Sequence, residues 1–423
     1  RTSAPPGAGR PEEELPRLLR GQAAAGGALV LAEEQAADEE LRVSRAVRAA
    51  LAEAGAELRE LWGYSLYHRA DLPFRKDLGD LPDGFTPFLQ RLERQCKVRE
   101  VLPRPRRGSL PLPEGAAAAA GPEPPAWRDL PYGESVQEPA RDPRSAFKLK
   151  GGESAAQLRL KHYLWDTDLV AKYFGLRNGM LGEDYSTKLS AHLAHGCISP
   201  RRIYHEIRRY EQERTANKST YWVVFELAWR DFFRFFTLKH GNRIFQAGGT
   251  VRAAGAWRRD ADALRRWKEG RTGWPLVDAN MRELASTGFM SNRGRQNVAS
   301  ILALDFGLDW RAGADHFESL LVDYDVSSNW GNWVAAAGLT GGRVNKFNVV
   351  KQGFDYDPDG EYVRTWIQEL RNVEGSTALE PWVLSAAERR KLGTEDYPER
   401  LQAGRGGQAA ARGRGAKRAR GWG

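Results

Sequence analysis

Apolar residues recur every three or four positions through most of the chain beyond Gly152. This spacing is typical of amphipathic helices, and convincing period-two strand patterns are absent from the same part of the sequence. We therefore predict a large all-helical domain over residues 147–400. Its predicted helices cover residues 155–174, 190–210, 221–240, 264–269, 277–285, 295–305, 314–321 and 362–370.

The beginning of the chain has a different pattern. Helical spacing at 12–22 and 38–54 alternates with short apolar runs at 28–31 and 57–62. Strand, helix and strand at this spacing predict a parallel α/β unit. Two strands are too few for a stable doubly wound sheet. We therefore expect its first strands to lie upstream of Arg1, and residues 1–102 to form a partial α/β domain.

Two stretches of biased composition set the remaining boundaries. Residues 103–146 are rich in Pro, Gly and Ala, which favours a connector with little structure of its own. Residues 401–423 are dominated by Gly, Arg and Ala. They are predicted to form a disordered tail that adds weak, salt-sensitive affinity for nucleic acid.

Composition narrows the choice of partners. Lys and Arg number 64 against 55 Asp and Glu, and the formal charge of +9 favours polyanions, nucleic acid first. Only Cys96 and Cys197 are present, which argues for a reducing compartment. No apolar run reaches the roughly 18 residues that a membrane span needs, so we expect no membrane association. The chain opens without Met or a signal peptide, which leaves its targeting undecided.

The common nucleotide-binding motifs are missing, because neither GxxxxGK[ST] nor a GxGxxG after a strand occurs. His192, His195 and Cys197 lie close together in sequence but lack a fourth metal ligand. Asp323 and Asp325 have the spacing of a divalent-cation site, yet two nearby arginines compete for these carboxylates. We therefore expect no metal.

Polar residues on predicted helices indicate a ligand site. They crowd the stretch 287–333, where buried polar groups cost free energy unless they pair with one another or line a polar ligand. We interpret them as ligand-binding. In the helix at 221–240, Glu226, Trp229, Arg230 and Phe233 share one face, which indicates either a Glu–Arg pair on a wet surface or the wall of a binding site. Residues 186–190 open a helix with hydroxyl groups, which fits either phosphate binding or ordinary N-capping.

Several motifs in order resemble one family. They are SNRGRQNVAS at 291–300, DWR at 309–311, DYDVSSNWGNW at 323–333, ELAWRDFFRF at 226–235 and TKLS at 187–190. Together they closely resemble the photolyase/cryptochrome family, most of all its cryptochromes of the DASH type. The resemblance extends over roughly residues 11–400, and so many ordered matches make chance agreement very improbable.

The resemblance implies an N-terminal α/β antenna domain, here partial, and an all-helical C-terminal domain that binds FAD. Asp323 paired with Arg295 resembles the pair beside the isoalloxazine ring. Asp325 resembles the acceptor for the N3–H of the ring, and Asn329 resembles the side chain that faces N5. The full set of implied FAD contacts is Tyr173, Ser186, Thr187, Lys188, Leu189, Ser190, Arg230, Asn292, Arg295, Asp323, Tyr324, Asp325 and Asn329.

The resemblance also implies residues for electron transfer and DNA. Trp333, Trp310 and Trp257 match the tryptophan chain that photoreduces the flavin, from proximal to distal. Glu226 and Trp229 match residues that contact a pyrimidine dimer flipped out of its strand. With Asn329 and the three tryptophans they form the implied catalytic set, while Arg293, Gln296 and Arg343 join Glu226 and Trp229 as implied DNA contacts.

The implied function is blue-light repair of cyclobutane pyrimidine dimers by an FAD-dependent photolyase. Gln296 stands where many double-strand photolyases have Met, which is typical of the DASH branch and favours UV-damaged single-stranded DNA. Ala335 stands where the family usually has a second aromatic for the lesion, which favours the alternative of a blue-light photoreceptor without repair. A methenyltetrahydrofolate antenna is the second implied cofactor. Gln35 stands near the position at which DASH members have a Glu that contacts the pterin, and this difference argues against a folate antenna. We expect an intracellular monomer, in the chloroplast, mitochondrion or nucleus.

Overall fold

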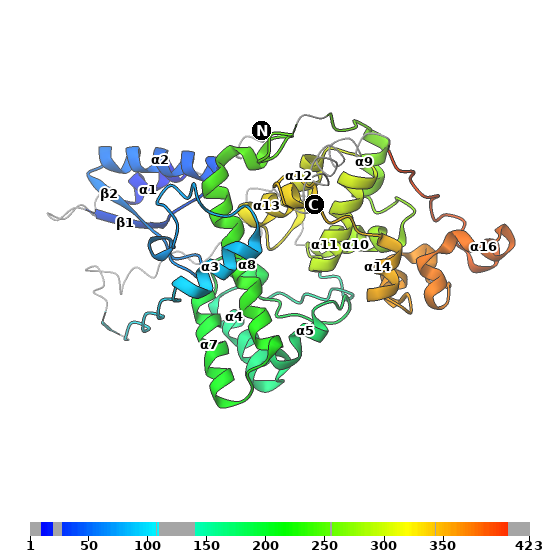
Figure 1. The fold of residues 1–423 in the computed structure, drawn as a ribbon, viewed down its shortest axis with the longest axis horizontal. Coiled ribbons are helices and arrows are strands. Elements are labelled where there is room, and N and C mark those ends of the chain that lie inside the picture. The colour runs from blue at the N-terminus through cyan, green and yellow to red at the C-terminus, as the bar shows by residue number, and fades with distance from the viewer. Residues whose placement is uncertain are drawn as a thin grey trace, which may run out of the picture. The chain divides into compact units, whose positions relative to one another are not determined.

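The chain forms two compact units in a computed structural model that describes residues 10–19, 28–106, 108–109, 140–253, 256–342 and 344–404 (Figure 1). The first unit comprises residues 1–35, 39–63 and 99–141, and the second comprises 36–38, 64–98 and 142–423. Strands lie in the first unit, and the described part of the second unit is built from helices. The predicted fold class is therefore confirmed. Most of the predicted connector and tail lies outside the described residues.

The first unit is a parallel pair of strands with helices on one face. β1 (Ala28–Glu33) pairs with β2 (Ala56–Leu61) in parallel, Ala28 opposite Ala56 and Glu33 opposite Leu61. The helices α1 (Pro11–Leu19) and α2 (Asp38–Glu53) pack on it. Alternate strand residues point to opposite faces, so one face is apolar and covered. That small core consists of Val47, Leu51 and Leu58, packed against Leu15, Leu19, Val30 and Ala56.

The second unit contains the remaining helices. They are α3 (Phe85–Gln95), α4 (Glu153–Lys161), α5 (Tyr173–Leu176), α6 (Ser190–Ala194), α7 (Pro200–Glu213), α8 (Lys218–His240), α9 (Ala261–Lys268), α10 (Pro275–Thr287), α11 (Asn292–Ser300), α12 (Trp310–Leu320), α13 (Val326–Ala336), α14 (Val349–Tyr356), α15 (Glu361–Trp366) and α16 (Ala386–Leu392).

Three of the predicted helices are wrong as single elements; the one predicted over 362–370 ends at Trp366, where Ile367 is extended and a short 3-10 helix (Gln368–Leu370) follows. The segment predicted as one helix over 190–210 is α6 and α7, because Gly196 takes a left-handed φ of +66° and Pro200 then starts a new helix capped by Ser199. The segment 155–174 is likewise interrupted, since Asp168 has a φ of +53°. At the breaks within 190–210 and 155–174 the apolar spacing continues because the pieces on both sides are helical and bury apolar residues, among them Leu193 and Ile203.

Helix α8 is the centre of the second unit, and its position follows from apolar burial and one buried carboxylate. Phe232, Phe235 and Phe236 are buried along it. Asp231 accepts hydrogen bonds from the backbone N–H groups of Leu66 (2.9 Å) and Tyr67 (2.8 Å). Burial raises the pKa of Asp231 to about 6. This carboxyl group therefore ties the segment after residue 63 to α8. None of the described helices is long and apolar enough to cross a membrane.

Candidate functional site

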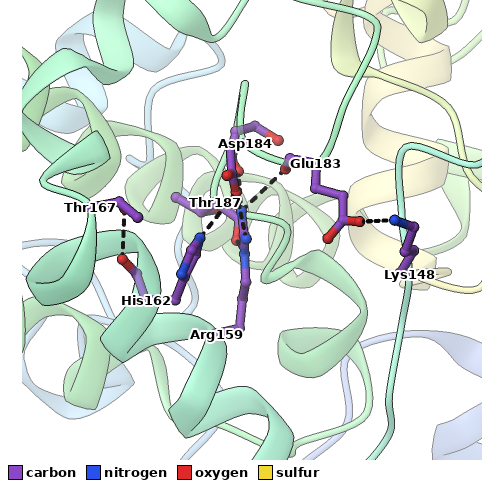
Figure 2. Close-up of polar contacts among 8 residues, drawn as sticks. Lys148, Arg159, His162, Thr167, Glu183, Asp184 and Thr187 are labelled. Atoms are coloured by element: carbon purple, nitrogen blue, oxygen red, sulfur yellow. Dashed lines mark hydrogen bonds and ion pairs between the residues drawn. The ribbon is translucent and has the colours of Figure 1, made fainter.

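Arg159 of α4 holds residues 183–187, the first part of the segment 183–190 that leads into α6, as Figure 2 shows. The guanidinium donates to the carbonyl oxygens of Glu183 (3.2 Å), Ser186 (3.0 Å) and Thr187 (2.9 Å). Its Nη1 also donates to Oδ1 of Asp184 at 2.8 Å. One arginine side chain thus fixes the path of the predicted diphosphate loop.

Several other polar groups of this loop make no hydrogen bond within the described part of the chain, although Glu183 pairs with Lys148 and Asp184 lies near His162. The hydroxyl oxygens of Ser186, Thr187 and Ser190, and the amide N–H groups of Thr187 and Lys188, make no hydrogen bond to described residues. Leu189, between them in sequence, is buried. A loop with several free donors fits a phosphate-bearing ligand, and the diphosphate of FAD is such a ligand.

Lys188 itself is an unusual member of the loop. It is only 5% exposed, and its Nζ lies 3.1 Å from the ring centroid of Tyr185 and 4.8 Å from that of Phe289. The amine has no hydrogen-bond partner among the described residues. Burial lowers the pKa of Lys188 to about 6, although the nearby Glu283 opposes this shift. The side chain of Lys188 is therefore an interior group.

The predicted pair of Arg295 and Asp323 is present in the structure. Nη2 of Arg295 lies 3.0 Å and 2.8 Å from the two carboxylate oxygens of Asp323, and Nε donates to the carbonyl of Met290 at 3.0 Å. The Asp323 side chain is almost fully buried. Because both of its oxygens are used by Arg295, this aspartate is committed to an ion pair.

Asp325 and Asn329 lie on the same short segment as Asp323. Asp325 caps α13, with Oδ1 accepting from the N–H of Ser328 at 2.7 Å. Asn329 is buried one turn later, and its Nδ2 donates to the carbonyl of Ala314 at 3.1 Å. Asn329 therefore has a fixed amide orientation. The two carboxylates and the amide thus have separate partners, Tyr324 is half-buried between them in sequence, and their shared role as flavin contacts stays a prediction.

The other predicted flavin contacts have diverse surroundings. Arg230 donates to the carbonyl of Tyr64 and stacks on the Tyr64 ring at 3.9 Å, so it is already engaged. Asn292 is exposed at the first position of α11. Tyr173 is buried in α5, and this burial raises the pKa of its hydroxyl.

The carboxylate of Glu226 forms a cluster with two guanidinium groups, those of Arg177 and Arg293. Nη1 of Arg177 lies 3.9 Å from Oε1 of Glu226. Arg293 donates to Oδ1 of Asn178 at 2.7 Å and to Oε1 of Gln296 at 2.8 Å. Burial raises the pKa of Glu226 even though both arginines oppose this shift. The half-buried carboxyl of Glu226 is therefore suited to exchange a proton or accept a hydrogen bond.

Arg177 is a residue that sequence reasoning missed. Its guanidinium lies 4.9 Å from the ring centroid of Phe174 and 4.7 Å from that of Trp222. Burial lowers the pKa of Arg177. A signal was present, because Arg177 follows Tyr173 by four positions and thus shares a helical face with a predicted contact. Arg343, in contrast, lies outside the described residues.

Trp229 lies in an aromatic cluster on α8. Its ring stacks on that of Phe85 with a centroid separation of 3.7 Å and an interplanar angle of 7°. Phe232 meets it edge-on at 5.7 Å. Trp229 remains only half-buried, so part of its ring is open to a ligand.

The three predicted electron carriers are only partly connected. Trp257 and Trp310 donate to the same carbonyl oxygen, that of Ala247, at 2.9 Å and 3.3 Å. Trp333 is buried and meets Trp267 edge-on at 6.0 Å. No ring contact joins Trp310 to Trp333 among the described residues. The structure therefore brings the two outer members together, while the inner member lies against other aromatic rings.

Comparison with known proteins identifies the family of the chain. The description "FAD binding domain of DNA photolyase" matches residues 222–413, and "DNA photolyase" matches residues 7–107. The chain is 52% identical to the chloroplastic/mitochondrial cryptochrome DASH of Ostreococcus tauri over 390 residues, 88% of this chain and 71% of that protein. It is 51% identical to cryptochrome DASH of Xenopus laevis over 383 residues, which are 90% of this chain and 71% of that protein. The structure of a Synechocystis cryptochrome superposes with a TM-score of 0.81 at 42% identity, and the match covers 93% of this chain and 80% of that one.

An α/β unit followed by a helical FAD-binding domain is the photolyase fold. The chain belongs to the photolyase/cryptochrome family, and the relatives above place it among the cryptochromes of the DASH type. The predicted family and the predicted FAD cofactor are thus confirmed. The folate antenna stays a prediction; Gln35 donates its amide N–H to the carbonyl of Glu33 at 3.2 Å. Within the described residues no group of His, Cys, Asp or Glu has the arrangement of a metal site.

Proposed function

We propose that the protein is a DASH-type deoxyribodipyrimidine photolyase, which uses blue light and FAD to split cyclobutane pyrimidine dimers, preferentially in single-stranded DNA. The observation that carries this proposal is the cluster of Glu226, Arg177 and Arg293 beside the half-buried ring of Trp229. A flipped dimer needs a flat apolar contact, a hydrogen-bonding group for its polar edge and cations for its phosphates. This cluster supplies all three.

The chemistry of two sets of residues supports the assignment of the cofactor. Residues 186–190 would hold the diphosphate, and Arg295, Asp323, Asp325 and Asn329 would surround the flavin ring. The Arg295–Asp323 pair places a fixed charge pair beside the ring, and Asp325 offers an acceptor. When bound and reduced, FAD supplies under blue light the single electron that opens the cyclobutane ring. The protein contributes orientation, fixed charges and exclusion of water.

On the lesion side, each residue has a separate role in the proposal. Glu226 makes a hydrogen bond at the polar edge of the bases, where burial raises the pKa of its carboxyl and so favours the protonated form. Trp229 stacks on the dimer. Arg177 and Arg293 contact the phosphates. The side chain of Gln296 is held by a hydrogen bond from Arg293, and it stands where many double-strand photolyases have the more apolar Met.

The tryptophans are proposed to deliver electrons from solvent to the cofactor. Trp257 is half-buried and Trp310 is fully buried. The shared carbonyl of Ala247 keeps their indole nitrogens close. Trp333 then completes the path toward the flavin site.

Blue-light repair of a defined thymine dimer, in single-stranded and in duplex oligonucleotides, tests the proposal. We expect light-dependent loss of the dimer, faster in the single strand, with a yellow protein that contains FAD. A folded, colourless protein would contradict the cofactor assignment. A yellow protein that repairs neither substrate would contradict photolyase activity alone.

One observation favours a second function, that of a blue-light photoreceptor that binds DNA without repair. Ala335 on α13 is half-buried and offers a single methyl group where an aromatic ring could support the lesion. Under this alternative the flavin and tryptophans operate, but dimer affinity is no higher than that for undamaged DNA. The Ostreococcus tauri relative is named chloroplastic/mitochondrial, so a fluorescent fusion of the full-length protein should be tested for these compartments. The monomeric state stays a prediction that light scattering would test.

A further inference from the structure

Arg159 concentrates its hydrogen bonds on one short loop. Four contacts, to the carbonyls of Glu183, Ser186 and Thr187 and to the carboxylate of Asp184, lie between 2.8 and 3.2 Å. The side chain is only 16% exposed. Figure 2 shows the guanidinium extending from α4 to these atoms. Because guanidinium donors form a rigid planar fork, their bonds fix both the position and the direction of the carbonyl groups.

The direction of the carbonyls determines the direction of the amides. In a trans peptide the carbonyl oxygen and the following N–H point to opposite sides, and the described chain contains no cis peptide. The N–H groups of Asp184, Thr187 and Lys188 therefore point away from Arg159. Those of Thr187 and Lys188 have no acceptor among the described residues.

The backbone at Lys188 completes this arrangement. It has a left-handed φ of +55°, which a lysine adopts only at a cost in free energy. Successive N–H groups around a left-handed residue form a concave nest that binds anions. The buried Lys188 amine, which has no hydrogen-bond partner in the described structure, adds a second unusual group to the same loop.

We propose that Arg159 is a positioning residue for the cofactor: without touching FAD, it turns the loop of residues 183–188 so that its amide N–H groups face the diphosphate. This inference rests on the proposed role of residues 186–190. Asp184 makes the arrangement possible, because its carboxylate balances the guanidinium charge. His162 lies 3.4 Å from the same carboxylate oxygen.

The test compares Arg159→Lys and Arg159→Ala with the wild type. A matched control is Arg265→Ala, since Arg265 also lies on a helix and pairs with carboxylates but contacts no part of this loop. FAD affinity is measured on the full-length protein after removal of flavin. The ³¹P NMR signals of bound FAD report the diphosphate, and the visible absorption bands of the flavin report the ring. Circular dichroism verifies that each variant is folded.

We expect Arg159→Ala to weaken FAD binding by about tenfold or more, as loss of an outer-shell partner does in metal sites. Arg159→Lys keeps the charge but cannot reach three carbonyls, so its loss should be intermediate. The ³¹P signals should move toward those of free FAD, while the flavin bands stay unchanged. The control should match the wild type in all three measurements.

Unchanged FAD affinity and ³¹P signals in a folded Arg159 variant would overturn the inference. So would changes in the flavin bands as large as those in the ³¹P signals, because they would indicate a general structural role. Failure of both variants to fold without cofactor would also contradict it. A wild type that binds no FAD would instead refute the proposed function.

Discussion

Glu226 shows how a single residue acquires a chemical role from its surroundings. Its carboxyl lies near two guanidinium groups, yet burial outweighs them and raises its pKa. A hydrogen bond to such a group is worth about 1.5–3 kcal/mol when one partner is charged. Glu226 is therefore the side chain whose change should affect the DNA substrate most directly.

We predict that Glu226→Ala lowers dimer affinity and repair rate by roughly 10- to 100-fold, the equivalent of that hydrogen-bond energy. Glu226→Gln should lose less, because the amide can still donate and accept. Light-dependent repair of a dimer-containing oligonucleotide measures both. Glu93→Gln is the matched control. Glu93 lies on α3 and accepts a hydrogen bond from Tyr221, which is on the same helix as Glu226 but is not a member of the cluster. Equal effects of all three changes would argue against a specific role.

Lys188 is a residue that destabilises the protein as long as no ligand compensates for it. Its pKa of about 6 in the folded state lies far below the value of 10.5 expected of an exposed lysine. Between these two values the unfolded chain binds a proton that the folded chain does not, so folding stability rises with pH in this range. The cost of the buried amine is therefore greatest at and below pH 6 and fades toward pH 10.

Lys188→Met should accordingly stabilise the cofactor-free protein by about 1–3 kcal/mol near pH 6, because Met fills the same space without a polar group. The gain should shrink as pH rises. Urea unfolding of the flavin-free protein over a pH series measures it. Lys148→Met is a suitable control, because Lys148 is exposed and pairs with Glu183 at 2.5 Å. A pH-independent difference between wild type and Lys188→Met would contradict the assignment.

At the scale of elements, the approach of α13 to α8 depends on one glycine. A Cβ atom added at Gly331 would lie 2.3 Å from the ring of Phe233 on α8. Gly331 lies on α13 between Asn329 and Trp333, two of the proposed flavin-side residues. The two helices therefore cannot be this close with any larger residue at position 331.

Gly331→Ala should cost about 1–3 kcal/mol through overpacking and reduce the amount of FAD bound per chain. Gly175→Ala is the matched control, because a Cβ at this exposed helical glycine meets nothing within 4 Å. Urea unfolding and the ratio of flavin to protein absorbance measure the two effects. Full FAD content in Gly331→Ala would show that α13 can shift without loss of the site.

Local patterns predicted the elements better than the contacts between them. The two strands, α2 and α8 follow from periodicity, and the segment 323–333 was identifiable because its polar residues lie close in sequence. Arg159 was not, since its partners lie 24 to 28 positions away and helical spacing gives no sign of them. Arg177 was missed for a related reason: its role depends on Glu226 and Arg293, which come from α8 and α11.

At the scale of the whole molecule, charge is distributed very unevenly. Residues 401–423 contain six Lys and Arg and no Asp or Glu, so they account for six of the nine net positive charges. Cations that neutralise phosphates make binding depend on salt. The tail should therefore contribute affinity for any single strand, whereas the site should contribute preference for a dimer.

We predict that a chain ending at residue 404 binds undamaged single-stranded DNA more weakly and with a salt slope smaller by up to about 4, the value for six phosphate contacts. Its preference for dimer-containing DNA should remain. Fluorescence anisotropy over a salt series measures both quantities. A tail of equal length with Gln in place of Lys and Arg separates charge from chain length, and it should behave like the truncated protein.

The carbonyl oxygen of Ala247 has a further consequence, because it is the common acceptor of Trp257 and Trp310. An indole that has lost an electron is a stronger acid, so its hydrogen bond to this oxygen becomes stronger. The hydrogen bond that the neutral indole donates to the same oxygen becomes weaker. The hydrogen bonds of the two rings are thus coupled through their shared acceptor. If the proposed electron path operates, this shared acceptor would disfavour a positive charge on both rings at once.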